Sequence, residues 1–279
     1  MQSVRLSTGD FNRLSRFITE VCGIRMSPAK KTLLEARLQK RIRSLGLRSF
    51  ADYLDYLFSV DGEKEEVVRM IDLVTTNKTD FFREPDHFDY LSQFVLPQWA
   101  RCAPHAGRQF RVWSAGCATG EEPFTLSMVL QEFAESSPGF DFQILATDIS
   151  TRVLESAHLA VYSEERTHPV PLYLKRKYFL RSRDRSAGLV RIAPVLREKV
   201  CFRHLNFMAD DFGLREELDI IFCRNVIIYF DRPTQERLLQ RLCGHLSLGG
   251  HLFMGHSETL SGLNVPLTAV YPTVYRKLT

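Results

Sequence analysis

Residues 112–123, V-W-S-A-G-C-A-T-G-E-E-P, decide the fold of this 279-residue chain. They join an apolar stretch at 110–114, which predicts a short strand, to a stretch at 121–135 that predicts a helix. Glycines in the connecting loop, residues 115–120, allow a ligand to approach the backbone closely. This order indicates the first unit of an α/β sheet with a binding site at the strand end.

Strands and helices continue to alternate along the rest of the chain. We expect buried strands at 143–147, 199–203, 219–223 and 251–255, helices at 151–160 and 231–246, a turn at 248–250, and a last antiparallel strand at 270–276. This alternation predicts an α/β fold with a doubly wound, mostly parallel sheet. Residues 176–192 interrupt the pattern and predict a small β insertion of two strands around an arginine-rich loop.

The N-terminal quarter shows only helical patterns. Apolar residues recur at helical spacing before Gly23, and further helices are expected at 28–45, 49–57 and 63–74. This region has no candidate nucleophile or metal cluster, so it predicts an all-α docking domain. We therefore divide the chain into that domain at 1–75, a linker or flap with a helix at 76–105, and the sheet domain at 106–279.

Positive charge is concentrated in the first 50 residues. They contain eleven lysines and arginines and three acids, a charge of +8, so the other residues sum to −4 in a chain of +4. In the helix at 28–45 the cations lie mostly off the apolar stripe and form one cationic side; we take Arg37, Lys40, Arg41 and Arg43 as candidate docking residues. Such a surface suits an acidic partner. A solvated helix face is the alternative that charge alone leaves open.

Several classes of protein are excluded by composition. No run of about 18 apolar residues occurs, which argues against a membrane span. The first residues lack the apolar segment of a secretory signal. The six cysteines lie far apart without a C-x-x-C pair, which favours reduced thiols and no metal site. We expect a cytoplasmic protein.

Acidic side chains follow the first two strands of the sheet. Glu121 and Glu122 open the first helix, where they would repel a pyrophosphate but suit an ammonium or sulfonium group. Capping of the helix dipole is the alternative for these two acids. Asp148 ends the second strand, where an acid accepts hydrogen bonds from ribose hydroxyls. Together these acids favour S-adenosyl-L-methionine over NAD as the ligand.

Polar groups also follow the later strands. Asn206 is placed to bond an adenine edge, and Phe207 offers an apolar face. Residues 223–230, C-R-N-V-I-I-Y-F, occupy the place where amine-directed nucleic-acid methyltransferases carry an N-P-P-Y type motif. The chain lacks that motif, which argues against methylation of an amine. Residues 75–84 are polar, then aromatic, then cationic, which fits a flap over the cofactor; a plain linker is the alternative.

These residues resemble the chemotaxis receptor methyltransferase (CheR) family. The matching stretches are T-T-N-K-T-D-F-F-R-E (75–84), V-W-S-A-G-C-A-T-G-E-E-P (112–123), A-T-D-I (146–149), I-F-C-R-N-V-I-I-Y-F (221–230), G-H-S-E (255–258) and the basic helix R-L-Q-K-R-I-R-S-L-G-L (37–47). Their order and spacing agree over essentially the whole chain.

The resemblance implies a fold, a reaction and a set of site residues. The fold would be that of class I S-adenosylmethionine-dependent methyltransferases with an N-terminal all-α domain. The enzyme would form glutamate methyl esters on cytoplasmic helices of methyl-accepting chemoreceptors and release S-adenosyl-L-homocysteine, tuning adaptation in chemotaxis-type signalling. By the family pattern the cofactor would contact Asn77, Thr79, Arg83, Glu122, Asp148, Asn206, Phe207, Arg224 and Asn225. The basic helix would dock on acidic receptor helices, and we expect a monomer that binds no nucleic acid and does not insert into the membrane.

The β insertion departs from one pattern in the family. Some members bind a receptor C-terminal pentapeptide there and carry a Gly-x-Gly turn. Residues 181–188, R-S-R-D-R-S-A-G, lack that turn, which argues against this form of tethering.

A glutamate acceptor sets modest demands on the enzyme. Its carboxylate is ionised at neutral pH and needs no general base. Positioning and exclusion of water are then the main tasks. Arg83 is the catalytic candidate for steering the carboxylate, and Tyr229 is a second one. A nucleic-acid methyltransferase and a non-catalytic S-adenosylmethionine-binding regulator are the alternatives.

Overall fold

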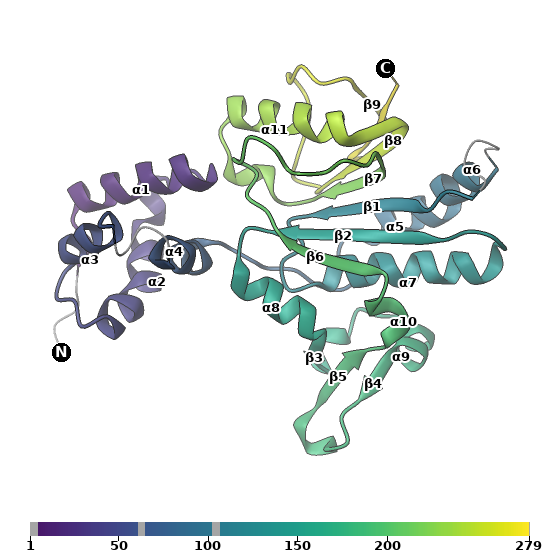
Figure 1. The fold of residues 1–279 in the computed structure, drawn as a ribbon, viewed down its shortest axis with the longest axis horizontal. Coiled ribbons are helices and arrows are strands. Elements are labelled where there is room, and N and C mark those ends of the chain that lie inside the picture. The colour runs from purple at the N-terminus through teal and green to yellow at the C-terminus, as the bar shows by residue number, and fades with distance from the viewer. Residues whose placement is uncertain (1–4, 61–64, 102–106, 279) are drawn as a thin grey trace.

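The computed structural model describes residues 5–60, 65–101 and 107–278. Four helices form the N-terminal unit: α1 (Thr8–Cys22), α2 (Lys31–Ser44), α3 (Phe50–Leu57) and α4 (Glu65–Val74). Ser7 caps α1 by accepting a hydrogen bond from the Asp10 amide at 3.0 Å, and Gly23 ends it in a left-handed conformation. The apolar sides of all four helices share one buried cluster, with Leu14, Leu38 and Tyr53 among its members. Figure 1 shows this unit beside the sheet domain, with an extended segment between them.

A seven-stranded sheet forms the second unit. Its strands are β1 (Phe110–Ala115), β2 (Phe142–Asp148), β6 (Val200–His204), β7 (Leu218–Cys223), β8 (Leu246–Met254), β9 (Leu267–Tyr271) and β10 (Val274–Lys277), in the order β6-β2-β1-β7-β8-β10-β9. The pairs from β6 to β8 are parallel, and β10 is antiparallel to both of its neighbours. The predicted doubly wound, mostly parallel sheet is confirmed.

Helices cover both faces of the sheet (Figure 1). On one face lie α5 (Asp86–Tyr90), α6 (Leu96–Ala100) and α7 (Glu121–Ser136), which share a cluster with Val112 and Ile144; on the other lies α11 (Arg232–His245), which packs with Trp113 and Ile221. Val112 and Trp113, which are neighbours in β1, thus belong to different clusters, because successive side chains of a strand point to opposite faces of the sheet. No helix among the described residues has the length and hydrophobicity that a membrane span requires.

The small insertion is larger than the predicted segment at 176–192. It has three strands, β3 (Val161–Ser163), β4 (Phe179–Arg181) and β5 (Leu189–Ile192), with β5 between the other two, and helix α9 (Leu172–Tyr178) overlaps its predicted start. α8 (Thr151–Leu159) precedes β3, and α10 (Pro194–Arg197) leads into β6. A three-residue edge strand such as β3 carries too short a pattern to be recognised in a sequence.

Two predictions near the C-terminus are also corrected. The expected turn at 248–250 lies inside β8, where the pairing with β7 shifts register and Gly249 has φ +79°. The glycines therefore mark a bulge. The expected strand at 270–276 is a hairpin of β9 and β10, because Pro272 and Thr273 form the turn between them.

Candidate active site

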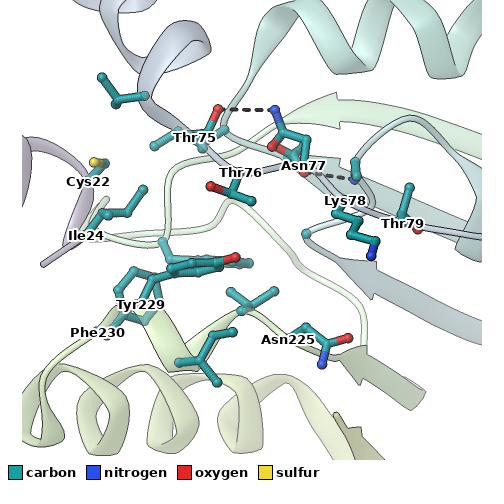
Figure 2. A pocket seen from close by; sticks show the side chains of 18 of the residues that line it. Cys22, Ile24, Thr75, Thr76, Asn77, Lys78, Thr79, Asn225, Tyr229 and Phe230 are labelled. Carbon is teal, nitrogen blue, oxygen red and sulfur yellow. Dashed lines mark hydrogen bonds between the residues drawn. The ribbon is translucent and has the colours of Figure 1, made fainter. Parts of the chain in front are cut away.

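A cavity of about 390 Å³ opens at the carboxyl ends of β1, β2 and β7. β1 lies between β2 and β7, so the cavity sits where the strand order reverses, the usual ligand site of an open α/β sheet. Its walls come from the N-terminal unit, the segment after α4 and the strand ends. Figure 2 shows Thr76, Asn77 and Lys78 on one side of this space, with Asn225 and Tyr229 facing them.

The cavity brings the predicted site residues together. Its lining includes Asn77, Thr79, Arg83, Glu122, Asp148, Asn206, Phe207, Arg224, Asn225 and Tyr229. These residues come from five separate segments of the chain. The predicted docking residues of α2 are not part of the lining.

Asp148 organises the loop after β1. Its Oδ2 accepts a hydrogen bond from the Ala118 amide and its Oδ1 one from the Ser150 amide, both at 2.9 Å. Burial raises the pKa of Asp148, and these two hydrogen bonds act in the opposite direction. Each carboxylate oxygen has a second lone pair, so Asp148 retains acceptor capacity toward the cavity.

Gly116 allows this loop to pass close to the loop after β7. It has φ +91°, and a Cβ at this position would lie 2.6 Å from Val226 Cγ2. Because a side chain fits neither the backbone conformation nor the space, glycine is required at this position.

The two acids at the start of α7 have different partners. Glu122 accepts a hydrogen bond from Ser114 Oγ at 2.7 Å and one from Arg224 Nε at 2.8 Å. Glu121 is fully buried away from the cavity, where it pairs with Arg166 and accepts a hydrogen bond from Thr119 Oγ1 at 2.7 Å. The expectation that both acids face a positively charged ligand is therefore corrected: only Glu122 lines the cavity.

Arg224 connects the strand ends to the segment at 75–84. Its Nη1 donates to the Arg83 carbonyl at 2.7 Å and also contacts Glu84 Oε2 at 3.3 Å and His87 Nδ1 at 3.2 Å. Burial and the Arg224 charge lower the pKa of His87 to about 4, so its imidazole is neutral and can accept this hydrogen bond. Glu84, His87 and His256 lie close enough to ligate one metal ion, but the Arg224 guanidinium already places a positive charge against the first two.

Aromatic residues fix the segment that carries Arg83. Phe81 is fully buried and makes edge contacts with Tyr162 and Phe179 at 5.0 and 5.6 Å between ring centroids. The Phe82 amide donates to Thr125 Oγ1 of α7 at 3.2 Å. Arg83 itself donates from Nη1 to the Lys78 carbonyl at 3.0 Å, which closes the segment on itself beside the cavity.

Asn206 joins the two units of the chain. Its Nδ2 donates to the Val21 carbonyl at 2.7 Å, and its Oδ1 accepts from the Met208 amide at 2.9 Å. The carbonyl of Tyr229 accepts a hydrogen bond from the Arg25 amide at 2.8 Å. These contacts hold the end of α1 against the loops after β6 and β7.

Glu258 supports the loop after β7, and the sequence reasoning missed its role. Its carboxylate accepts hydrogen bonds from the amides of Asn225, Val226, Ile227 and Gly255 at 2.7–2.9 Å. The G-H-S-E motif was the available signal, but an acid in a loop does not reveal which amides it meets. The carboxylate fixes Asn225, which has φ +58°, at the edge of the cavity.

Exposed residues at the cavity mouth were also missed. Leu33 and Ile228 are 44% and 46% exposed and line the cavity together with the exposed Thr76 and Lys78. Lys30 places its Nζ 5.3 Å from the centre of the Tyr229 ring. The mouth therefore combines apolar and cationic side chains.

The cationic side of α2 is smaller than expected. Arg41 forms a two-pronged ion pair with the buried Glu66, and Arg37 donates to the Val74 and Thr75 carbonyls at 2.5 and 3.0 Å. Lys40 and Arg43 are exposed. The expectation of four exposed cations is corrected to two, because the other two join α2 to α4.

The cavity suits S-adenosylmethionine. Its volume lies in the range of small-ligand sites, with polar groups such as Glu122 and Asp148 beside apolar ones such as Ile149 and Phe207. Such a lining offers acids to the polar and charged parts of the molecule and an apolar wall to its adenine.

Comparison with known proteins identifies the family. The all-α domain of CheR methyltransferases matches residues 9–75, and their S-adenosylmethionine-binding domain matches residues 77–275. The chain is 36% identical to the chemotaxis protein methyltransferase of Borreliella burgdorferi, over 99% of this chain and 96% of that protein. It is 39% identical to chemotaxis protein methyltransferase 2 of Pseudomonas aeruginosa (98% and 95% covered) and 38% identical to the enzyme of Escherichia coli (98% and 92%). The chain therefore belongs to the CheR family of S-adenosylmethionine-dependent chemotaxis methyltransferases.

Proposed function

We propose that the protein transfers a methyl group to glutamate side chains on cytoplasmic helices of methyl-accepting chemoreceptors. The observation that carries this proposal is the cavity itself, which is lined by the N-terminal unit, the segment bearing Arg83 and the loops at the strand ends, with Lys30 and Lys78 among its residues. An acidic protein segment suits the entrance of this cavity. The relatives that match nearly the full length of the chain are chemotaxis protein methyltransferases, which supports methyl transfer within chemotaxis signalling.

The cofactor residues have separate roles in this proposal. Asp148 accepts hydrogen bonds from the ribose, Glu122 and Arg224 hold the amino-acid portion, and Phe207 covers the adenine. Asn77, Thr79, Asn206 and Asn225 complete the polar lining, and their positions around one cavity support these assignments. S-adenosylmethionine supplies an electrophilic methyl group on a sulfonium.

The acceptor needs orientation and no proton removal. A glutamate carboxylate is ionised at neutral pH, so no residue of the chain has to act as its base. Arg83 orients this anion from the flank, and Tyr229 assists from the opposite loop; both line the cavity. Buried Phe81 keeps the Arg83 segment in place, which fixes the direction of approach.

Docking involves the exposed side of α2. Lys40 and Arg43 attract acidic receptor helices, while Arg37 and Arg41 hold α2 in the orientation that presents them. Leu33 and Ile228 offer apolar contact at the mouth. In this proposal the enzyme acts in the cytoplasm, as a monomer, on the receptor and on no nucleic acid.

The test is transfer of labelled methyl groups from S-adenosylmethionine to membranes that contain candidate receptors. A glutamate methyl ester releases volatile methanol in mild alkali. Alkali-labile label in the receptor band is the expected result. Label that stays in protein after alkali, or that enters added transfer RNA instead, would contradict the proposal.

A further inference from the structure

Asp72, near the end of α4, contacts the start of α8 in the sheet domain. Its Oδ1 accepts a hydrogen bond from Ser150 Oγ at 2.7 Å and its Oδ2 one from Thr151 Oγ1 at 2.8 Å. The Arg152 amide also donates to Oδ1, at 3.3 Å. Both carboxylate oxygens are thus bonded to the other unit, at a helix N-terminus where negative charge is favourable.

Ser150 links this contact to Asp148. Ser150 is fully buried, and its hydroxyl accepts a hydrogen bond from the Val153 amide as the cap of α8. Its own amide donates to Asp148 Oδ1 at 2.9 Å. One residue therefore bonds Asp72 through its side chain and Asp148 through its backbone. A shift of α4 along α8 displaces the residue that orients Asp148.

On its other side α4 is bonded to α2. Arg41 pairs with Glu66 at the start of α4, and Arg37 bonds the Val74 carbonyl at its end. A continuous series of hydrogen-bonded elements therefore runs from α2 through α4 to the loop of Asp148. The cavity lies between the same parts, since Val74 and Asp148 both line it.

We infer that Asp72 is a positioning residue that couples docking on α2 to cofactor binding at Asp148. This inference rests on the roles proposed for α2 and Asp148. Asp72 does not line the cavity and acts through Ser150. Because docking and cofactor binding favour the same placement of α4 against α8, each increases the affinity for the other by the same factor.

The experiment measures, by calorimetry, how tightly S-adenosylhomocysteine binds to the unaltered protein and to Asp72→Ala, each with and without a cytoplasmic receptor fragment. The fragment should raise the affinity of the unaltered protein about 5- to 150-fold, the usual range of coupling between two sites, and Asp72→Ala should lose most of this gain. In methylation assays the KM for S-adenosylmethionine should rise by a similar factor, with kcat at saturating cofactor near that of the unaltered enzyme. Asp72→Asn should recover part of the affinity, because an amide oxygen still accepts one hydrogen bond. Asp55→Ala is the matched control, since Asp55 is an exposed acid on α3 of the same unit.

A gain in affinity from the receptor fragment that is unchanged in a folded Asp72→Ala protein would overturn the inference. Should that variant fail to fold, an unchanged gain in Asp72→Asn overturns it equally. Asp148→Ala separates this failure from that of the proposed function. Normal cofactor binding by Asp148→Ala would contradict the ribose role of Asp148. Weak binding by Asp148→Ala together with a normal gain from receptor in Asp72→Ala would contradict the coupling alone.

Discussion

Arg224 donates a hydrogen bond from Nε to Glu122 Oε2 at 2.8 Å, and both side chains are almost entirely buried. The pair joins the end of β7 to the start of α7 across the first loop of the sheet. A buried charge is costly unless it is paired and hydrogen-bonded, and here Ser114 and the Arg83 carbonyl supply further bonds. The pair therefore sets the position of the Arg83 segment as well as one wall of the cavity.

Loss of one member of this pair should destabilise the protein more than loss of both. Arg224→Ala leaves the Glu122 carboxylate buried without its cation and should lower the free energy of unfolding by ~3–5 kcal/mol. Glu122→Gln in the same chain should restore part of that loss, because the unpaired charge is gone. Urea unfolding of the two single variants and the double variant gives the coupling energy. Additive losses would show that the two side chains do not stabilise each other.

Charge reversal at the exposed positions of α2 should weaken methylation of receptor. Lys40→Glu with Arg43→Glu should raise the KM for receptor and leave the affinity for S-adenosylhomocysteine unchanged. Added salt should produce a similar effect in the unaltered enzyme, since exposed charges are screened over ~8–10 Å at moderate ionic strength. Arg215→Glu with Arg237→Glu is the matched control, because it changes the charge equally at exposed positions of the sheet domain. If both double variants raise the KM for receptor equally, the exposed cations of α2 form only a solvated helix face and do not dock the receptor.

Removal of the Arg83 guanidinium should slow the reaction more than it destabilises the fold. Arg83→Ala should raise the barrier by ~2–4 kcal/mol, as loss of a positioned electrostatic group does. Arg83→Lys should recover only part of the rate, because a single ammonium cannot hold a carboxylate in two-pronged geometry. Single-turnover methylation at saturating cofactor, with a thermal melt of each variant, measures this. If Arg83→Ala methylates at the full rate, Arg83 has no role in the reaction.

The contribution of two buried histidines to stability should fall as pH falls from about 6.5 toward 4. Burial lowers the pKa of both His87 and His251 to about 4, while in the unfolded chain a histidine titrates near ~6.5. The unfolded chain therefore binds more protons in this window, and each histidine contributes up to ~1.4 kcal/mol of lost stability per pH unit. His251→Phe should flatten this dependence in urea unfolding at pH 7, 6 and 5, and the exposed His168→Gln should not. If stability changes equally with pH in the unaltered protein and in both variants, His251 does not contribute to the pH dependence.

The sequence predicts the sheet domain well because its strands are strongly patterned. Asp148 and the loop at 115–120 follow a strand, and the ends of neighbouring parallel strands necessarily meet. Partners that are distant in the sequence could not be predicted. Nothing in the residue pattern of α2 indicates that Arg41 pairs with Glu66, 25 residues away. Glu258 and Asp72 were overlooked for the same reason: their roles arise from amides and hydroxyls that only the folded chain places around them.

The most direct test of the account is to identify the methylated atom. A purified cytoplasmic receptor fragment is incubated with the enzyme and S-adenosylmethionine, digested at mildly acidic pH and mapped by mass spectrometry. We predict one added methyl group on glutamate side chains of the receptor helices, lost in mild alkali and absent when those glutamates are replaced by alanine. A methyl group on lysine, arginine or a chain terminus, stable to alkali, would contradict it.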